Sequence, residues 1–125
     1  MVGDPVTGDL RYFIIRYIDS VAQLEALLLL RANPAEDWNA TNVASRLYAS
    51  EQDAADVLGR LCDDGLIHCN DGIYRYASDN PEISELVDRL AETYSKHLIP
   101  VTNMIHAKPR RIREFADAFK FRKDK

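Results

Sequence analysis

The sequence lacks the features that would direct the chain into a membrane or out of the cell. Its densest apolar run, Leu27 to Leu30, is far shorter than the roughly 20 residues that a membrane-spanning helix requires. The opening stretch, MVGDPVTGDL, contains no lysine or arginine and no apolar core, so it does not resemble a secretory signal. We therefore expect a cytoplasmic protein that does not bind membranes.

Cysteine is scarce as well. The two cysteines, Cys62 and Cys69, are too few for a disulfide framework in a chain of 125 residues. His68 lies beside them, but the spacing fits no usual zinc motif and a fourth ligand is not evident. We expect Cys62 to fill a small apolar space at a helix end and Cys69 to share a strand face with Ile67. The sequence thus predicts structural thiols, no bound metal and no cofactor.

Motifs for common enzymatic reactions are also absent. The sequence has no glycine loop that could cradle a phosphate, no HExxH motif and no nucleophile elbow. The acidic pairs Glu36-Asp37 and Asp63-Asp64 are neighbours in sequence, which does not aim both carboxylates at one substrate. We predict that the protein is not an enzyme.

Positive charge is missing from most of the chain and concentrated at its end. Residues 1–80 hold 6 Lys/Arg against 13 Asp/Glu, a balance of −7, and residues 81–107 hold 2 against 4, a balance of −2. Residues 108–125 hold 8 against 3, a balance of +5. A chain this acidic is not a general nucleic-acid binder, but its last segment can form a local basic patch.

What the sequence does contain is a succession of amphipathic helices. Apolar residues spaced three and four apart predict a helix over residues 9–18. Ser20 followed by Gln23 forms a capping box and predicts a second helix over residues 20–32, which Pro34 ends. This second helix is apolar nearly all round, so we expect it at the centre of the domain.

Shorter elements follow. Asn39 is suited to cap a short helix over residues 40–47, and Ser50 is suited to cap a fourth helix, which Gly65 should end in a left-handed conformation. Two β-prone runs joined by an Asn-Asp-Gly turn then predict a hairpin, over residues 66–69, 70–72 and 73–76.

This order of elements resembles the winged helix-turn-helix family, in particular the MarR-like transcriptional regulators. The resemblance covers residues 20–78, and three stretches carry it: WNATNVASRL for the first helix of the motif, ASEQDAADVLGRL for the recognition helix, and DDGLIHCNDGIYRY for the hairpin, or wing. It implies a mainly α fold with a small β-hairpin wing. Asn80-Pro81, with proline suited to the first helical position, predicts that long C-terminal helices follow. The resemblance also implies a regulator that binds DNA as a dimer, with the second helix in the major groove and the wing beside the backbone.

The predicted recognition helix is poorly charged for contact with DNA. Residues 50–67 contain five carboxylates and one arginine. Affinity for duplex DNA comes largely from Lys and Arg side chains that displace counterions, so most of the cations must come from residues 108–125. The candidate DNA contacts are Gln52, Asp56 and Arg60 of the recognition helix, Arg75 of the wing, and Arg110, Arg111, Arg113, Lys120 and Arg122 of the C-terminal segment.

Two alternatives to DNA contact remain open. The basic segment can instead pack on the domain as a solvated amphipathic helix, through an apolar stripe of Ile112, Phe115, Ala116 and Phe119. Winged helices also serve as protein-binding modules, because a fold does not fix a function. In that case the acidic face of the recognition helix would dock on a basic protein partner.

A long apolar stripe after Asn80-Pro81 predicts dimerisation. Its residues alternate at spacings of four and three, as in a heptad seam, and a single small domain has little use for so long a stripe. We therefore expect a homodimer with a winged helix-turn-helix domain over residues 1–80 and a dimerisation segment over residues 81–125. The seam consists of Ile83, Val87, Leu90, Tyr94, His97, Val101 and Met104.

Proline interrupts this predicted helix. Pro100 cannot donate a hydrogen bond to the carbonyl of Lys96, so it should kink or split the helix. His97 lies beside the break, and we expect its side chain to bond a carbonyl group that the break frees.

Overall fold

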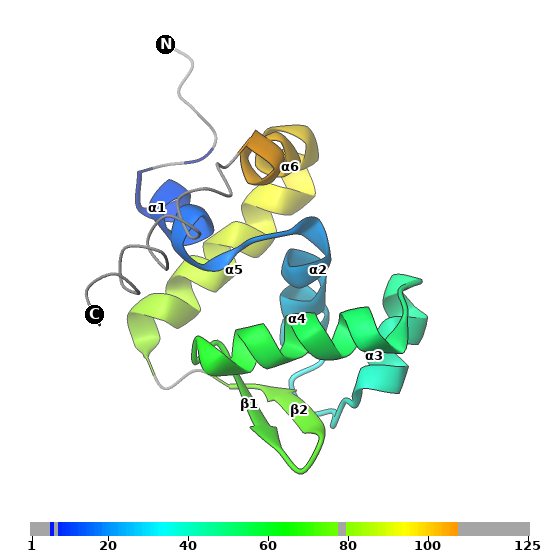
Figure 1. Ribbon diagram of the computed structural model, residues 1–125. Helices are drawn as coiled ribbons and strands as arrows, with labels where there is room; N and C mark the ends of the chain where they lie inside the picture. Colours follow the sequence, from blue (N-terminus) through cyan, green and yellow to red (C-terminus); the bar gives the residue numbers. More distant parts are fainter. Residues whose placement is uncertain (1–5, 7, 78–79, 108–125) are drawn as a thin grey trace, which may run out of the picture.

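The computed structural model describes residue 6 and residues 8–77 and 80–107, and this part of the chain is mainly helical with one two-stranded antiparallel hairpin (Figure 1). Residues 108–125, which hold five of the candidate DNA contacts, lie outside the described residues. The elements are α1 (Gly8–Tyr17), α2 (Val21–Ala32), α3 (Ala40–Leu47), α4 (Glu51–Asp63), β1 (Ile67–Asn70), β2 (Ile73–Tyr76), α5 (Pro81–Lys96) and α6 (Leu98–Ala107).

The junction between α1 and α2 is fixed by a buried glutamine. The Ser20 hydroxyl accepts a hydrogen bond from the backbone N–H of Gln23 at 3.1 Å, which confirms the predicted cap. The Gln23 side chain accepts from the N–H of Asp19 at 2.8 Å and donates to the carbonyl of Tyr17 at 2.7 Å. Its return bond thus reaches Asp19 rather than Ser20, and both halves of the buried amide are satisfied.

Helices α3 and α4 start and stop where the sequence predicts. The side chain of Asn39 accepts a hydrogen bond in the first turn of α3, and the Ser50 hydroxyl does so in α4. Three residues separate the helices, and the turn is made possible by Tyr48, which adopts a left-handed conformation with φ 56°. Gly65 follows α4 with φ 79°, as expected for a glycine that ends a helix.

The hairpin has a third, one-residue strand that the sequence analysis missed. Asp71 and Gly72 both have positive φ, which is the signature of a tight type I′ turn. On the other side of β2, Trp38 and Tyr74 exchange two backbone hydrogen bonds, of 2.9 and 2.6 Å. Because both backbone groups of Tyr74 are bonded to Trp38, β2 lies between residue 38 and β1. Strand β1 is therefore the outer edge of this small sheet.

One hydrophobic core unites the described residues. Leu24, Leu27 and Leu30 of α2 are fully buried, which confirms that α2 is central. Figure 1 shows α5 crossing the domain next to α1, and the same buried cluster contains residues of α1, α2, α4, α5 and α6. The segments on either side of residue 80 thus share a core.

The predicted dimer seam is used mainly inside the chain. Its members Val87, Leu90 and Val101 are at most 1% exposed in a single chain, and Ile83, Tyr94 and Met104 are partly buried against the same core. The premise that the stripe would otherwise face water is therefore wrong. The stripe is covered in a single chain because α5 and α6 each pack their apolar face against the rest of the domain. Dimerisation itself stays a prediction.

The helix break lies three residues before Pro100. Helix α5 ends at Lys96, and Pro100 is the third residue of α6, where a backbone N–H would have no partner within the helix. The predicted split is thus confirmed, with the proline in a position that tolerates it. The side chain of His97 is exposed and forms no hydrogen bond with a described residue, so the role predicted for it is wrong.

Candidate nucleic-acid interface

The polar face of α4 is presented by a rigid pair of helices. Ala54, Leu58 and Leu61 of α4 are buried and pack with Val43 and Ala44 of α3 in the common core. The Thr41 hydroxyl also donates a hydrogen bond to the carboxylate of Glu51, which joins the first turns of the two helices. Residues on the opposite side of α4 therefore face solvent in a fixed orientation.

Two of the predicted DNA contacts on this face bond each other. Gln52 and Asp56 are exposed one turn apart, and the Gln52 amide donates to the Asp56 carboxylate at 3.0 Å. A free Asp56 could accept a hydrogen bond from cytosine, and a free Gln52 could pair with adenine. In the structure, each of these two side chains uses part of its hydrogen-bonding capacity on the other.

Arg60, the one arginine of α4, points toward acids of its own chain. Its guanidinium lies 3.3 Å from the Asp19 carboxylate and 4.0 Å from that of Asp64. Burial raises the pKa of Asp64, and Arg60 only partly offsets this effect. The Asp64 Oδ2 atom accepts no hydrogen bond from a described residue. Arg60 therefore serves first as a counter-charge at the α1–α2 junction.

The arginine of the hairpin is paired in the same way. Arg75 of β2 forms an ion pair with Asp37, which precedes the bridge residue Trp38. Both side chains are more than half exposed, and exposed pairs of this kind contribute only about 0–1 kcal/mol. A phosphate group could therefore replace Asp37 as the partner of Arg75 at small cost.

The structure adds one cation that the sequence analysis overlooked. The Arg46 guanidinium of α3 lies 5.4 Å from the centre of the Trp38 ring and forms no ion pair with a described residue. The local sequence pattern did not indicate a role for Arg46, because its stacking on Trp38 joins residues on either side of the α3 cap. Its charge is thus available to an external anion.

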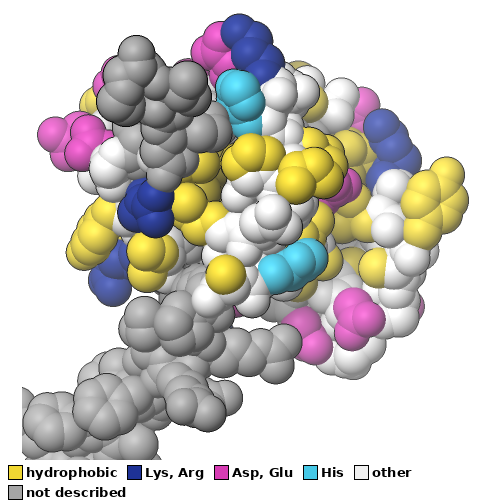
Figure 2. Space-filling view, turned by 90° about the horizontal axis from the view of Figure 1, so that it is seen from above, with side chains coloured by type: hydrophobic (Ala, Val, Ile, Leu, Met, Phe, Trp, Pro, Cys, Tyr) yellow, Lys and Arg dark blue, Asp and Glu magenta, His cyan; other side chains and the backbone are white. Residues whose placement is uncertain are grey.

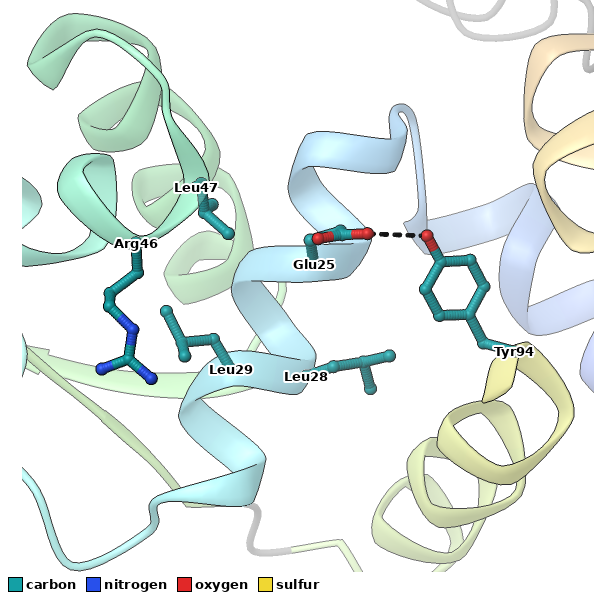
Figure 3. Close-up of a pocket in the computed structure, with 6 residues that line it drawn as sticks. All are labelled: Glu25, Leu28, Leu29, Arg46, Leu47 and Tyr94. Atoms are coloured by element: carbon teal, nitrogen blue, oxygen red, sulfur yellow. Dashed lines mark hydrogen bonds between the residues drawn. The ribbon is translucent and has the colours of Figure 1, made fainter. Parts of the chain in front are cut away.

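Arg46 also lines a cleft between α2, α3 and α5. The cleft encloses about 340 Å³, and Figure 3 shows Arg46 and Tyr94 at its two ends with leucines between them. The Tyr94 hydroxyl donates a hydrogen bond of 2.7 Å to the Glu25 carboxylate. Partial burial, followed by this hydrogen bond, raises the pKa of Tyr94 to about 12. The Tyr94–Glu25 bond therefore links α5 to α2.

We expect replacement of Tyr94 by phenylalanine to lower the free energy of unfolding by about 1 kcal/mol at neutral pH. The folded-state pKa of about 12 lies above the ordinary value of 10.0. The contribution is therefore complete below about pH 10 and is lost as the pH rises through 12. Urea unfolding of both proteins between pH 7 and 11 measures the difference. Tyr12→Phe, at a residue that is 67% exposed, is the matched control. A difference independent of pH would contradict this assignment.

The two cysteines, predicted to be separate thiols, form a disulfide. Cys62 in the last turn of α4 is bonded to Cys69 in β1, with Cα atoms 6.1 Å apart. The number and spacing of the cysteines did not indicate this pair, because a bond requires the fold to bring the two side chains together. The turn at Gly65 reverses the chain and brings the strand back along the helix end, which places the two side chains within bonding reach.

Comparisons with known proteins do not indicate a function, so a function can be argued only from the contacts described above. None of the described helices is both long and apolar enough to cross a membrane. No protein-family model matches the chain, and neither curated proteins nor solved structures gave a significant match.

Proposed function

We propose that the protein is a non-enzymatic winged-helix regulator that binds duplex DNA in the cytoplasm. The observation that carries the proposal is the arrangement of α3 and α4. Two packed helices are joined by a three-residue turn, the second exposes a polar face, and a hairpin follows it directly. Helix-turn-helix proteins place the second helix of such a pair in the major groove while the first crosses the backbone.

In this proposal the cations that contact phosphate come from three places. Arg46 lies in the last turn of α3, the helix that would cross the backbone, and it carries no ion pair with a described residue. Arg75 can exchange a weak internal partner for phosphate, whereas Arg60 would have to leave Asp19 and Asp64 to do so. These three are too few to balance the acids around α4, so residues 108–125 supply the remaining charge.

A second candidate function is a protein-interaction adaptor, and the internal ion pairs favour it. With Arg60 and Arg75 engaged by Asp19 and Asp37, the exposed face of α4 presents mainly carboxylates. A negative surface of this kind complements a basic protein partner and repels duplex DNA. The adaptor requires no contribution from residues 108–125.

We further propose that the protein acts as a dimer, through apolar residues that the single chain leaves uncovered. Leu98 and Ile99 at the start of α6 are 48% and 61% exposed. Figure 2 looks onto this end of the molecule and shows hydrophobic side chains gathered on its surface. Contiguous exposed apolar surface of this type marks interaction sites.

Fluorescence anisotropy on random and genomic duplexes, from low to physiological salt, tests the DNA proposal. We expect binding that weakens steeply as salt rises, because phosphate contacts release counterions. Arg46→Gln should weaken binding to all sequences similarly, whereas Arg31→Gln, which alters a cation paired with Asp88, is the matched control. Absence of binding at low salt would replace this proposal by the adaptor.

A further inference from the structure

The disulfide joins an exposed cysteine to a half-buried one. Cys69 is an exposed residue of β1, whereas Cys62 is half-buried at the end of α4. Thiol–disulfide exchange begins when a thiolate attacks one sulfur in line with the bond, and the rate depends on access to that sulfur. An external thiol therefore reaches Cys69 first, and Cys62 is the leaving group.

Within the described residues, the bond holds the edge strand β1, whereas β2 has a partner on each side. Strand β2 is anchored on its inner side by the paired backbone of Trp38 and Tyr74. Strand β1 pairs with β2 alone, and only Ile67, at its beginning, is buried. Towards the hairpin turn, the Cys62–Cys69 bond is the covalent connection between this edge strand and α4.

We propose that Cys62–Cys69 is a thiol–disulfide exchange site for small thiols, and that its opening releases the outer part of β1 from α4. One thiol attacks the Cys69 sulfur and forms a mixed disulfide, while Cys62 departs as a thiolate and takes up a proton. A second thiol attacks the external sulfur and frees Cys69. Two thiols are thereby oxidised to one disulfide, and the protein disulfide is reduced to two thiols. This inference does not depend on DNA binding.

Charge around the site selects among thiols. Asp63 and Asp64 follow Cys62 directly, and the carbonyl end of α4 lies at the same place. Negative charge disfavours the departing Cys62 thiolate and repels an anionic attacking thiol. The site therefore reacts more readily with a neutral thiol, such as 2-mercaptoethanol, than with an anionic one such as glutathione.

Reduction kinetics of the native protein test the exchange site. After oxidation with glutathione disulfide, we expect no free thiols, and release of two thiols per chain at a rate proportional to the concentration of 2-mercaptoethanol. Asp63→Asn should accelerate reduction by glutathione about twofold to fourfold at low salt, and should affect 2-mercaptoethanol less. A rate that does not depend on thiol concentration would show that reduction requires unfolding, and would overturn the proposal.

Hydrogen exchange tests the release of β1. On reduction, we expect the backbone amides of His68 and Asn70, which face β2 in the register, to exchange about tenfold faster, as expected for local opening of an edge strand. The backbone amides of Trp38 and Tyr74 are the internal control. Each donates to the carbonyl of the other residue, and their exchange should change little. The variant with both Cys62→Ser and Cys69→Ser should reproduce the reduced protein. Equal exchange in the oxidised and reduced states would refute the coupling.

Discussion

Leu90→Ala is expected to lower the free energy of unfolding by about 2–5 kcal/mol, the usual cost of removing a fully buried leucine side chain. Leu90 is 0% exposed and belongs to the core that joins α5 to the rest of the chain. Because domains of this size are stable by only about 5–15 kcal/mol, this is a large share of the total. Urea unfolding monitored by the fluorescence of Trp38, the one tryptophan in the sequence, measures it.

The matched control for this change is Leu98→Ala, at a residue that is 48% exposed. It should alter stability by less than about 1 kcal/mol, because little buried area is lost. Light scattering of the same proteins separates packing from assembly: a dimer formed through Leu98 and Ile99 should weaken with Ile99→Asp while the chain stays folded. If Leu90→Ala left stability unchanged but abolished a dimer, α5 would form an interface rather than part of the core.

The heptad seam illustrates how far the sequence predicts this fold. Periodicity identified the apolar face of α5 and the split near Pro100 correctly, because both depend on local geometry. It could not identify what covers Val87 and Leu90, because that depends on the return of α5 across α1, a contact between residues distant in sequence. An apolar stripe that packs inside its own chain has the same residue spacing as one that packs against a second chain.

The candidate site shows the same limit for charge. The composition of α4 predicted an acidic face, and Gln52, Asp56 and Asp63 are exposed. The pairing of Arg75 with Asp37 joins residues 38 positions apart, and the stacking of Arg46 on Trp38 crosses a helix cap. Local rules describe caps and turns, so they predicted Ser50 and Gly65 but neither of these side-chain partners.

Deletion of residues 108–125 is expected to remove most of the affinity for duplex DNA. The segment carries eight of the chain's 16 Lys and Arg residues. If half of these eight contact phosphate, log affinity should fall with log salt at a slope of about −3.6 per protomer. Between 50 and 200 mM salt this slope corresponds to roughly a 150-fold loss of affinity in the full chain. The shortened chain keeps every helix from α1 to α6, so its folding can be verified independently.

Two further variants decide what the deletion means. A full-length chain with the eight cations of residues 108–125 changed to glutamine retains Phe115 and Phe119, and should bind as weakly as the shortened chain if charge is the cause. Asp56→Asn should tighten non-specific binding, because it removes a negative charge from the face of α4 that the groove would meet. Anisotropy titrations over the same salt range measure all three proteins. If the glutamine variant binds like the native chain while the shortened chain does not, the segment contributes through packing, and its charge does not explain how an acidic α4 could approach DNA.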